Sequence, residues 1–208
     1  MPLLSFGCSL TYGQALESDL EKNTPSKLAW PQLLADELGL ECQNHSVPGS
    51  SNKLILDKIL NTKINQQDKV VVQWSYLARW CMFEPTERID LGPWIKDHPF
   101  YKYVWNPIDC FFTNKIITDY AWLHLKTVGC DFVFAHIEKD SHYYWTEDDL
   151  EYVFVEDKFD HAKFIEKSIK SFNLDKATDN AHPGPESHKK FAEYLAKQPL
   201  FNQLTKTK

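Results

Sequence analysis

The stretch KVVVQW, residues 69–74, decides how this chain of 208 residues folds. It is a nearly continuous run of apolar, mostly β-branched residues, without the alternation of a half-exposed strand. Such a run is typical of a parallel strand that helices cover on both faces. It therefore predicts an inner strand of an α/β sheet.

The segments on either side of this strand alternate between strand and helix patterns. Short apolar runs predict strands, and apolar residues at helical spacing predict helices. The predicted strands are 3–6, 41–46, 69–74 and 130–137, and the predicted helices are 27–40, 52–64, 114–129 and 185–198. Because each strand is followed by a helix, we expect an α/β fold, a three-layer α/β/α sandwich with a mainly parallel sheet.

Two segments interrupt this order. Residues 75–112 are rich in aromatic residues and prolines, and residues 138–163 mix aromatic residues with acidic pairs. No Gly/Ser-rich linker, repeat or low-complexity tract divides the chain. We therefore expect one domain over residues 1–208, in which both segments are excursions over the ends of the strands.

Composition and charge narrow the class of protein. Hydrophobic residues make up 43%, and 23 Lys and Arg against 29 Asp and Glu give a net charge of −6. This balance argues against a general nucleic-acid binder, which would carry a basic patch. No stretch approaches the ~20 apolar residues of a membrane span, and the N-terminus lacks the pattern of a signal peptide. A cytoplasmic location is expected, and a phage or viral source would fit equally well.

The five cysteines are odd in number and scattered, with no C-x-x-C pair. This distribution predicts reduced, mostly buried thiols and no disulfide framework or zinc site.

Ligands of an open α/β sheet bind at the carboxyl ends of the strands. Polar residues and a glycine directly follow the first three predicted strands, and an Asp–His pair precedes the last predicted helix. These residues are Ser9, Gly49, Asn52, Ser75, Arg79, Asp179 and His182.

The chemistry of these residue types is coherent. A serine hydroxyl needs a base to remove its proton, and an imidazole base needs a carboxylate that fixes its tautomer. In DNAH, residues 179–182, one loop supplies both the acid and the base. The backbone N–H groups of Ser9 and Gly49 are candidate donors to a developing oxyanion, each worth about 3 kcal/mol.

Three motifs in this order resemble the SGNH (GDSL-like) hydrolase family. GCSLT at 7–11 stands for G-D-S-x-T, with Cys8 in place of the aspartate, and NHSVPGSSN at 44–52 and DNAHP at 179–183 follow. The resemblance covers most of the chain and implies a flavodoxin-like α/β/α fold. It makes Ser9 the nucleophile, His182 the base, Asp179 its orienting acid and Gly49 a backbone oxyanion donor.

The chain departs from the family where a G-x-N-D block should follow the third strand. The sequence there is QWSY, so Ser75 falls at the position of the asparagine. The Ser75 hydroxyl is one candidate oxyanion donor, over a shorter reach than an asparagine, and Asn52 or Arg79 is the other candidate for the missing donor. Arg79 is alternatively a group that holds a carboxylate or phosphate of the substrate, or a partner in a surface salt bridge.

The resemblance implies a serine esterase that works through an acyl-serine intermediate without a cofactor or metal. A small-molecule or glycan ester is the expected substrate, with acetyl on a carbohydrate the first choice. Two alternatives stay open: a non-catalytic glycan- or protein-binding member of the same fold, and an O-acyltransferase with the same triad. Each of these features alone also has a purely structural interpretation. Ser9 is then the N-cap of a helix, and DNAHP is a turn. His188 is interpreted as a packing or surface residue.

Overall fold

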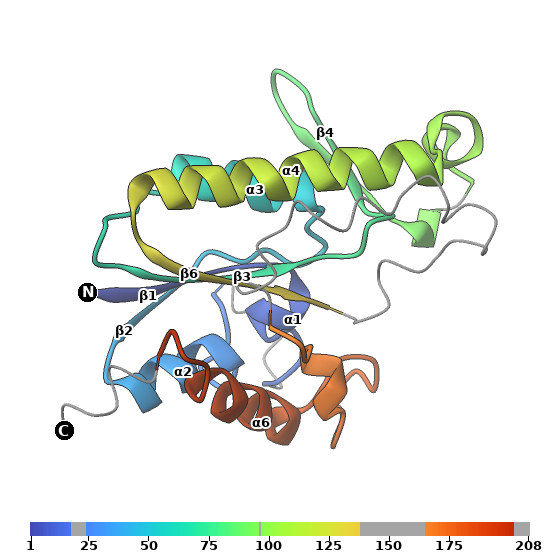
Figure 1. Ribbon diagram of the computed structural model, residues 1–208. Coiled ribbons are helices and arrows are strands. Elements are labelled where there is room, and N and C mark those ends of the chain that lie inside the picture. Colours follow the sequence, from blue (N-terminus) through green and yellow to red (C-terminus); the bar gives the residue numbers. More distant parts are fainter. Residues whose placement is uncertain (18–23, 96, 138–164, 202–208) are drawn as a thin grey trace.

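A four-stranded parallel sheet forms the centre of the protein (Figure 1). The structure is a computed structural model, and it describes residues 1–17, 24–95, 97–137 and 165–201. The strands lie in the order β2-β1-β3-β6, and each neighbouring pair is parallel. Their bounds are β1 (Pro2–Phe6), β2 (Glu41–Asn44), β3 (Lys69–Trp74) and β6 (Asp131–His136). The four predicted strands and the parallel sheet are confirmed.

Strand β3 lies between β1 and β6 and is buried on both faces. Val71 packs into the apolar cluster on one face of the sheet. Val70, Val72 and Trp74 pack into the cluster on the other face. The run is apolar at successive positions because neither face of this strand meets water.

Helices cover both faces of the sheet (Figure 1). Helices α2 (Trp30–Leu38) and α6 (Pro185–Ala196) pack on one face, and α3 (Asn52–Asn61) and α4 (Pro107–Val128) pack on the other. The edge of the Trp30 ring meets the Phe191 ring at 5.5 Å between centroids, which joins α2 to α6. The fold is therefore the expected three-layer α/β/α sandwich.

Helix α4 begins seven residues before the predicted start at residue 114. The Asn106 side chain accepts a hydrogen bond from the Asp109 N–H at 3.1 Å, and Pro107 occupies the first turn. An N-cap asparagine followed by proline is a recognised start signal. The prediction missed it because these residues lie in the aromatic, proline-containing segment.

The segment 75–112 also holds an antiparallel hairpin of β4 (Trp80–Phe83) and β5 (Arg88–Leu91). A short helix, η1 (Pro93–Ile95), and a π-helical turn, η2 (Phe100–Val104), follow the hairpin. Trp80 of the hairpin stacks on Phe100 of η2 at 5.7 Å. The segment is thus an arm whose aromatic residues pack on one another, and its last six residues belong to α4.

The other predicted excursion, 138–163, lies outside the described residues. Directly after it, the Ile165 N–H donates to the Phe134 carbonyl at 3.0 Å, so the chain returns beside β6. Helix η4 (Ile169–Phe172) then leads toward the loop before α6. In the part of the chain that is described, no helix has the length and apolar character to cross a membrane. None of the five cysteines, all of which lie in the described ranges, forms a disulfide, and four of them are buried.

Candidate active site

Helix α1 (Ser9–Tyr12) follows β1 closely in the chain, and Ser9 is its first residue. A Cβ on Gly7 would lie 2.1 Å from the Thr11 Oγ1 and 3.2 Å from the Gln73 carbonyl oxygen. Glycine at this position therefore lets the chain turn tightly against the end of β3. The Thr11 hydroxyl fixes the turn by donating to the Gln73 Oε1 at 2.6 Å.

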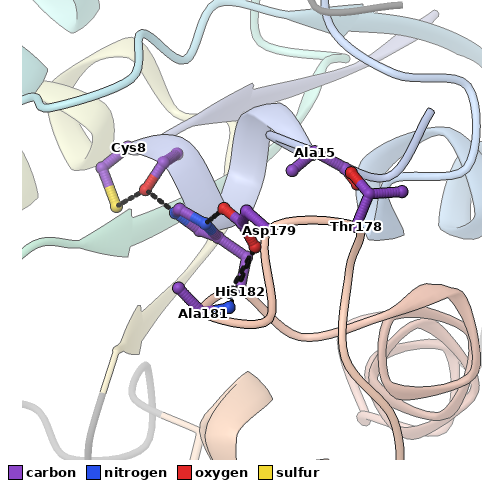
Figure 2. A network of polar contacts seen from close by, with 7 residues as sticks. Cys8, Ala15, Thr178, Asp179, Ala181 and His182 are labelled. Carbon is purple, nitrogen blue, oxygen red and sulfur yellow. Dashed lines mark hydrogen bonds and ion pairs between the residues drawn. The ribbon is translucent and has the colours of Figure 1, made fainter. Parts of the chain in front are cut away.

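Ser9, His182 and Asp179 lie in one line of polar contacts (Figure 2). The His182 Nε2 lies 3.0 Å from the Ser9 Oγ, and the His182 Nδ1 lies 2.5 Å from the Asp179 Oδ2. Residues 173 positions apart are thereby brought into hydrogen-bond distance. Ser9 is buried, whereas the side chains of His182 and Asp179 keep 22% and 33% of their surface exposed.

Asp179 is held in its ionised form. Its partial burial opposes ionisation, but hydrogen bonds from the His182 and Ala181 backbone N–H groups and from the His182 ring lower the pKa of Asp179 to about 2. Both backbone bonds are 3.0 Å long. A carboxylate only accepts hydrogen bonds, so the neutral imidazole carries its proton on Nδ1. The Nε2 is then the acceptor that faces the Ser9 hydroxyl.

The loop that carries Asp179 and His182 is tied to the loop behind the serine. The Thr178 N–H and hydroxyl both donate to the Ala15 carbonyl, at 3.0 and 2.9 Å (Figure 2). Within the loop, the Ala177 N–H donates to the His182 carbonyl at 3.0 Å. These bonds fix the position of His182 relative to Ser9.

Gly49 lies in the loop between β2 and α3, which is also tied to the serine turn. The Val47 N–H donates to the Gly7 carbonyl at 3.2 Å, and the Asn44 side chain donates to the Thr11 carbonyl at 2.8 Å. Gly49 has φ of +78°, and nothing stands within 4 Å of a Cβ built there. Its N–H group has no hydrogen-bond partner among the residues that the structure describes.

Asn52 and Ser75 form a buried clamp together with Asn114 of α4. The Ser75 N–H donates to the Asn52 Oδ1 at 2.6 Å, and the Asn52 Nδ2 donates to the Ser75 carbonyl at 3.2 Å and the Asn114 Oδ1 at 2.7 Å. Both N–H bonds of the Asn52 amide are therefore used within the protein. As placed, Asn52 has no N–H left for an oxyanion.

Arg79 lies at the edge of this clamp. Its guanidinium donates to the Ser75 Oγ at 3.2 Å and stacks 5.0 Å from the Tyr76 ring and 5.3 Å from the Trp94 ring. No carboxylate of the described residues lies within ion-pair distance of it. Ser75 and Arg79 are thus hydrogen-bonded to each other. They follow β3, which pairs with β1, the strand that precedes Ser9.

His188, six residues after His182, belongs to the core and not to this site. It is 1% exposed, and its Nδ1 accepts the Trp30 N–H at 3.1 Å, at the first residue of α2. Burial lowers the pKa of His188 to about 3, so the ring is neutral at pH 7. Of the two roles that the sequence left open, the structure gives His188 the packing role.

Two residues of this region were not found from the sequence. Asn114 lies four helical turns from the end of α4 and carries no motif, and Thr178 precedes the Asp–His pair by one residue. They are recognised as part of this region only by their hydrogen bonds to residues far away in the sequence. Over the described ranges, no group of three or more His, Cys, Asp or Glu residues has the arrangement of a metal site.

Comparison with known proteins places the fold. No protein-family model and no curated protein matches the sequence. Among solved structures, a protein named as a lipolytic member of the G-D-S-L family from Desulfitobacterium hafniense DCB-2 matches with a TM-score of 0.53 at 13% identity. This match covers 94% of this chain and 98% of that one.

Two esterases are similar as well. A carbohydrate esterase, described as having an active site with divergent catalytic and non-catalytic binding functions, has a TM-score of 0.59 at 14% identity, over 100% of this chain and 69% of its own. An acetyl xylan esterase from the rumen bacterium Butyrivibrio proteoclasticus has a TM-score of 0.53 at 10% identity, over 98% and 64%. The chain therefore shares the α/β/α fold of these proteins.

Proposed function

We propose that this protein is a serine ester hydrolase in which Ser9, His182 and Asp179 form the catalytic triad. The observation that carries the proposal is the His182 ring, which bridges the Ser9 Oγ and the Asp179 carboxylate. His182 Nε2 takes the proton of Ser9 while the serine oxygen attacks the carbonyl carbon of the ester. The imidazolium then gives the proton to the leaving alcohol, and water releases the acyl group by the same two steps in reverse.

Backbone N–H groups hold the negative oxygen of the tetrahedral intermediate in this proposal. Gly49 is one donor, because its N–H has no partner in the described part of the chain and its surroundings are open. The Ser9 N–H at the start of α1 is the other. The Asn52 amide supplies no donor unless the clamp opens, whereas the Ser75 Oγ accepts a bond from Arg79 and keeps its own O–H for donation.

A small acyl group on a carbohydrate is the proposed substrate. The exposed Trp94 ring, beside the guanidinium of Arg79, offers an apolar surface of the kind on which sugar rings stack. The two esterases of similar fold also act on carbohydrate esters by their names. Arg79 binds a carboxylate or phosphate of the substrate if one is present.

The test is covalent labelling by a fluorophosphonate, read as intact-protein mass. One adduct that maps to Ser9 in the wild type and is absent from Ser9→Ala and His182→Ala would support the triad. Ser171→Ala, at an exposed serine, is the matched control and should label like the wild type. No adduct on folded wild type, together with no Ser9-dependent turnover of p-nitrophenyl acetate, would overturn the proposal.

The second candidate is a non-catalytic binding protein on the same fold. The clamp favours it, because the Asn52 amide, one of the candidate side-chain donors, already uses both N–H bonds within the protein. This candidate predicts saturable glycan binding that Ser9→Ala leaves unchanged, with no turnover. An O-acyltransferase would instead label at Ser9 and turn over only when an acceptor alcohol is supplied.

A further inference from the structure

Helix α4 exposes large apolar side chains along its whole length. Its inner side is in the core, where Ile117, Ala121 and Leu125 are buried. Its outer side carries a stripe at helical spacing, which we call the α4 stripe. The members and their exposed fractions are Ile108 (39%), Phe112 (47%), Ile116 (67%), Tyr120 (52%) and Leu123 (56%).

This stripe is large for the surface of a monomer. At on the order of 100 Å² of exposed surface per side chain, the five residues present roughly 500 Å², near the largest patches of typical monomers. Tyr103 and Val104, which are 74% and 66% exposed, lie just before the helix. Together the seven approach the ~800 Å² per partner of a standard protein interface.

Two charged residues near the ends of α4 are placed for pairing between two copies, while Lys115 and Asp119 in its middle pair with each other within one copy. Asp109 is the third residue of α4, and Lys126 is the third from its end; both are exposed. In an antiparallel pair of identical helices, a twofold axis through the middle sets Asp109 of each copy opposite Lys126 of the other. The same operation sets Phe112 opposite Leu123 and gathers Ile116 and Tyr120 around the axis.

We propose that the α4 stripe is the interface of a homodimer in which two copies of α4 pack antiparallel. Figure 1 shows α4 running along the length of the sheet on the outside of its layer, and the helix is about 33 Å long. A pair of such helices buries the apolar stripe in the centre and leaves the two Asp109–Lys126 pairs at its ends. Apolar burial supplies the affinity, and the charges select the antiparallel direction over the parallel one.

The test is the mass in solution of the full chain, measured by sedimentation equilibrium over a range of micromolar concentrations. The wild type should be a dimer. Ile116→Glu should weaken the dimer on the order of 30-fold or more, because it places a charge at the centre of the interface. Ile116 is mostly exposed within one copy, so the far-UV circular dichroism spectrum, which reports the fold of each copy, should stay unchanged. Leu60→Glu, at an exposed leucine of α3, is the matched control and should remain dimeric.

A charge exchange tests the direction of packing. Asp109→Lys and Lys126→Asp should each weaken the dimer several-fold, and the double variant should restore it. A wild type that stays monomeric throughout would overturn the proposal and leave the stripe for a different protein. A dimer that survives Ile116→Glu would also overturn it, and a double variant without recovery would overturn the antiparallel arrangement.

Discussion

The two sides of the candidate site use their polar groups in different ways. On the triad side, Ser9, His182 and Asp179 form a chain that ends in a serine hydroxyl. On the clamp side, Asn52, Ser75 and Asn114 bond to one another and are buried. Serine is the one residue type on both sides, and Ser75 takes part in the clamp through its backbone N–H and carbonyl. What separates the two sides is exposure, because the His182 and Asp179 side chains keep part of their surface open to solvent and the clamp does not.

The largest effect is expected from a substitution of Ser9, and it tests the role assigned to the triad side. Ser9→Ala should lower the turnover of an acetyl ester by about 10⁴-fold or more, because the acyl intermediate can no longer form. The free energy of unfolding should change by less than ~0.5 kcal/mol. Initial rates and urea unfolding of the same preparations measure both quantities. A variant that keeps a tenth of the wild-type rate would remove Ser9 from the chemistry.

The clamp should show the opposite behaviour. Asn52→Ala leaves the buried Ser75 N–H and the Asn114 Oδ1 without partners and should lower the free energy of unfolding by about 2–3 kcal/mol. The rate per folded molecule should fall less than tenfold. Urea unfolding followed by tryptophan fluorescence gives the first value, and Asn61→Ala, at an exposed asparagine of α3, is the matched control. A loss of rate of 100-fold or more without loss of stability would instead make Asn52 an oxyanion donor.

His188 and His182 are both near α6, but only the His188 ring is fully buried, so the two histidines should respond differently to pH. The folded-state His188 pKa of about 3 lies below the ordinary value, so the unfolded chain binds more protons between pH 6.5 and 3. Stability should therefore decrease as the pH falls through this window, while Asp175 and His182 supply the nearby charges. Between pH 6.5 and 4.5 the loss in the wild type should exceed that of His188→Gln by about 2 kcal/mol. Equal losses in the two proteins would contradict a buried neutral His188.

The dependence of the rate on pH, on the acid side, also tests the triad, and the expected change in rate is smaller than that of Ser9→Ala. A histidine base works only when it is neutral, so the rate should fall as the pH is lowered from neutrality into the acid range. The pKa of Asp179 is about 2, so its carboxylate stays ionised throughout and should add no second step. Steady-state kcat/KM of an acetyl ester at constant ionic strength measures this profile. A flat profile would argue against His182 as the base.

Arg79 should give the smallest effect, and one that depends on the substrate. With a pair of acetyl esters that differ by one carboxylate, Arg79→Gln should raise the KM of the anionic ester by about tenfold. The KM of the neutral ester should change less than twofold. Arg88→Gln is the control, because Arg88 pairs with Asp90 on the hairpin. Equal changes in KM for both esters would mean that Arg79 does not bind the carboxylate and only packs between the Tyr76 and Trp94 rings.

Much of the fold followed from local pattern. The apolar runs at 69–74 and 130–137 became β3 and β6, and the glycine after residue 38 ended α2 as expected. The start of α4 and the hairpin at 80–91 were missed, because aromatic residues at irregular spacing fit neither the helical nor the strand period. The comparisons with solved structures support the fold and leave the chemistry of Ser9 to experiment.

The sequence by itself determined the alternation of strands and helices, which places the loops that hold residues 9, 49 and 75 after the carboxyl ends of parallel strands. Periodicity and turn residues act over a few positions, so a linear pattern is enough to specify them. Only the tertiary structure decided which polar groups pair. The bonds from Thr178 to Ala15 and from Asn52 to Ser75 and Asn114 join segments far apart in the chain. A hydrogen bond depends on distances of a few tenths of an ångström, and those distances are set by the packing of the whole fold.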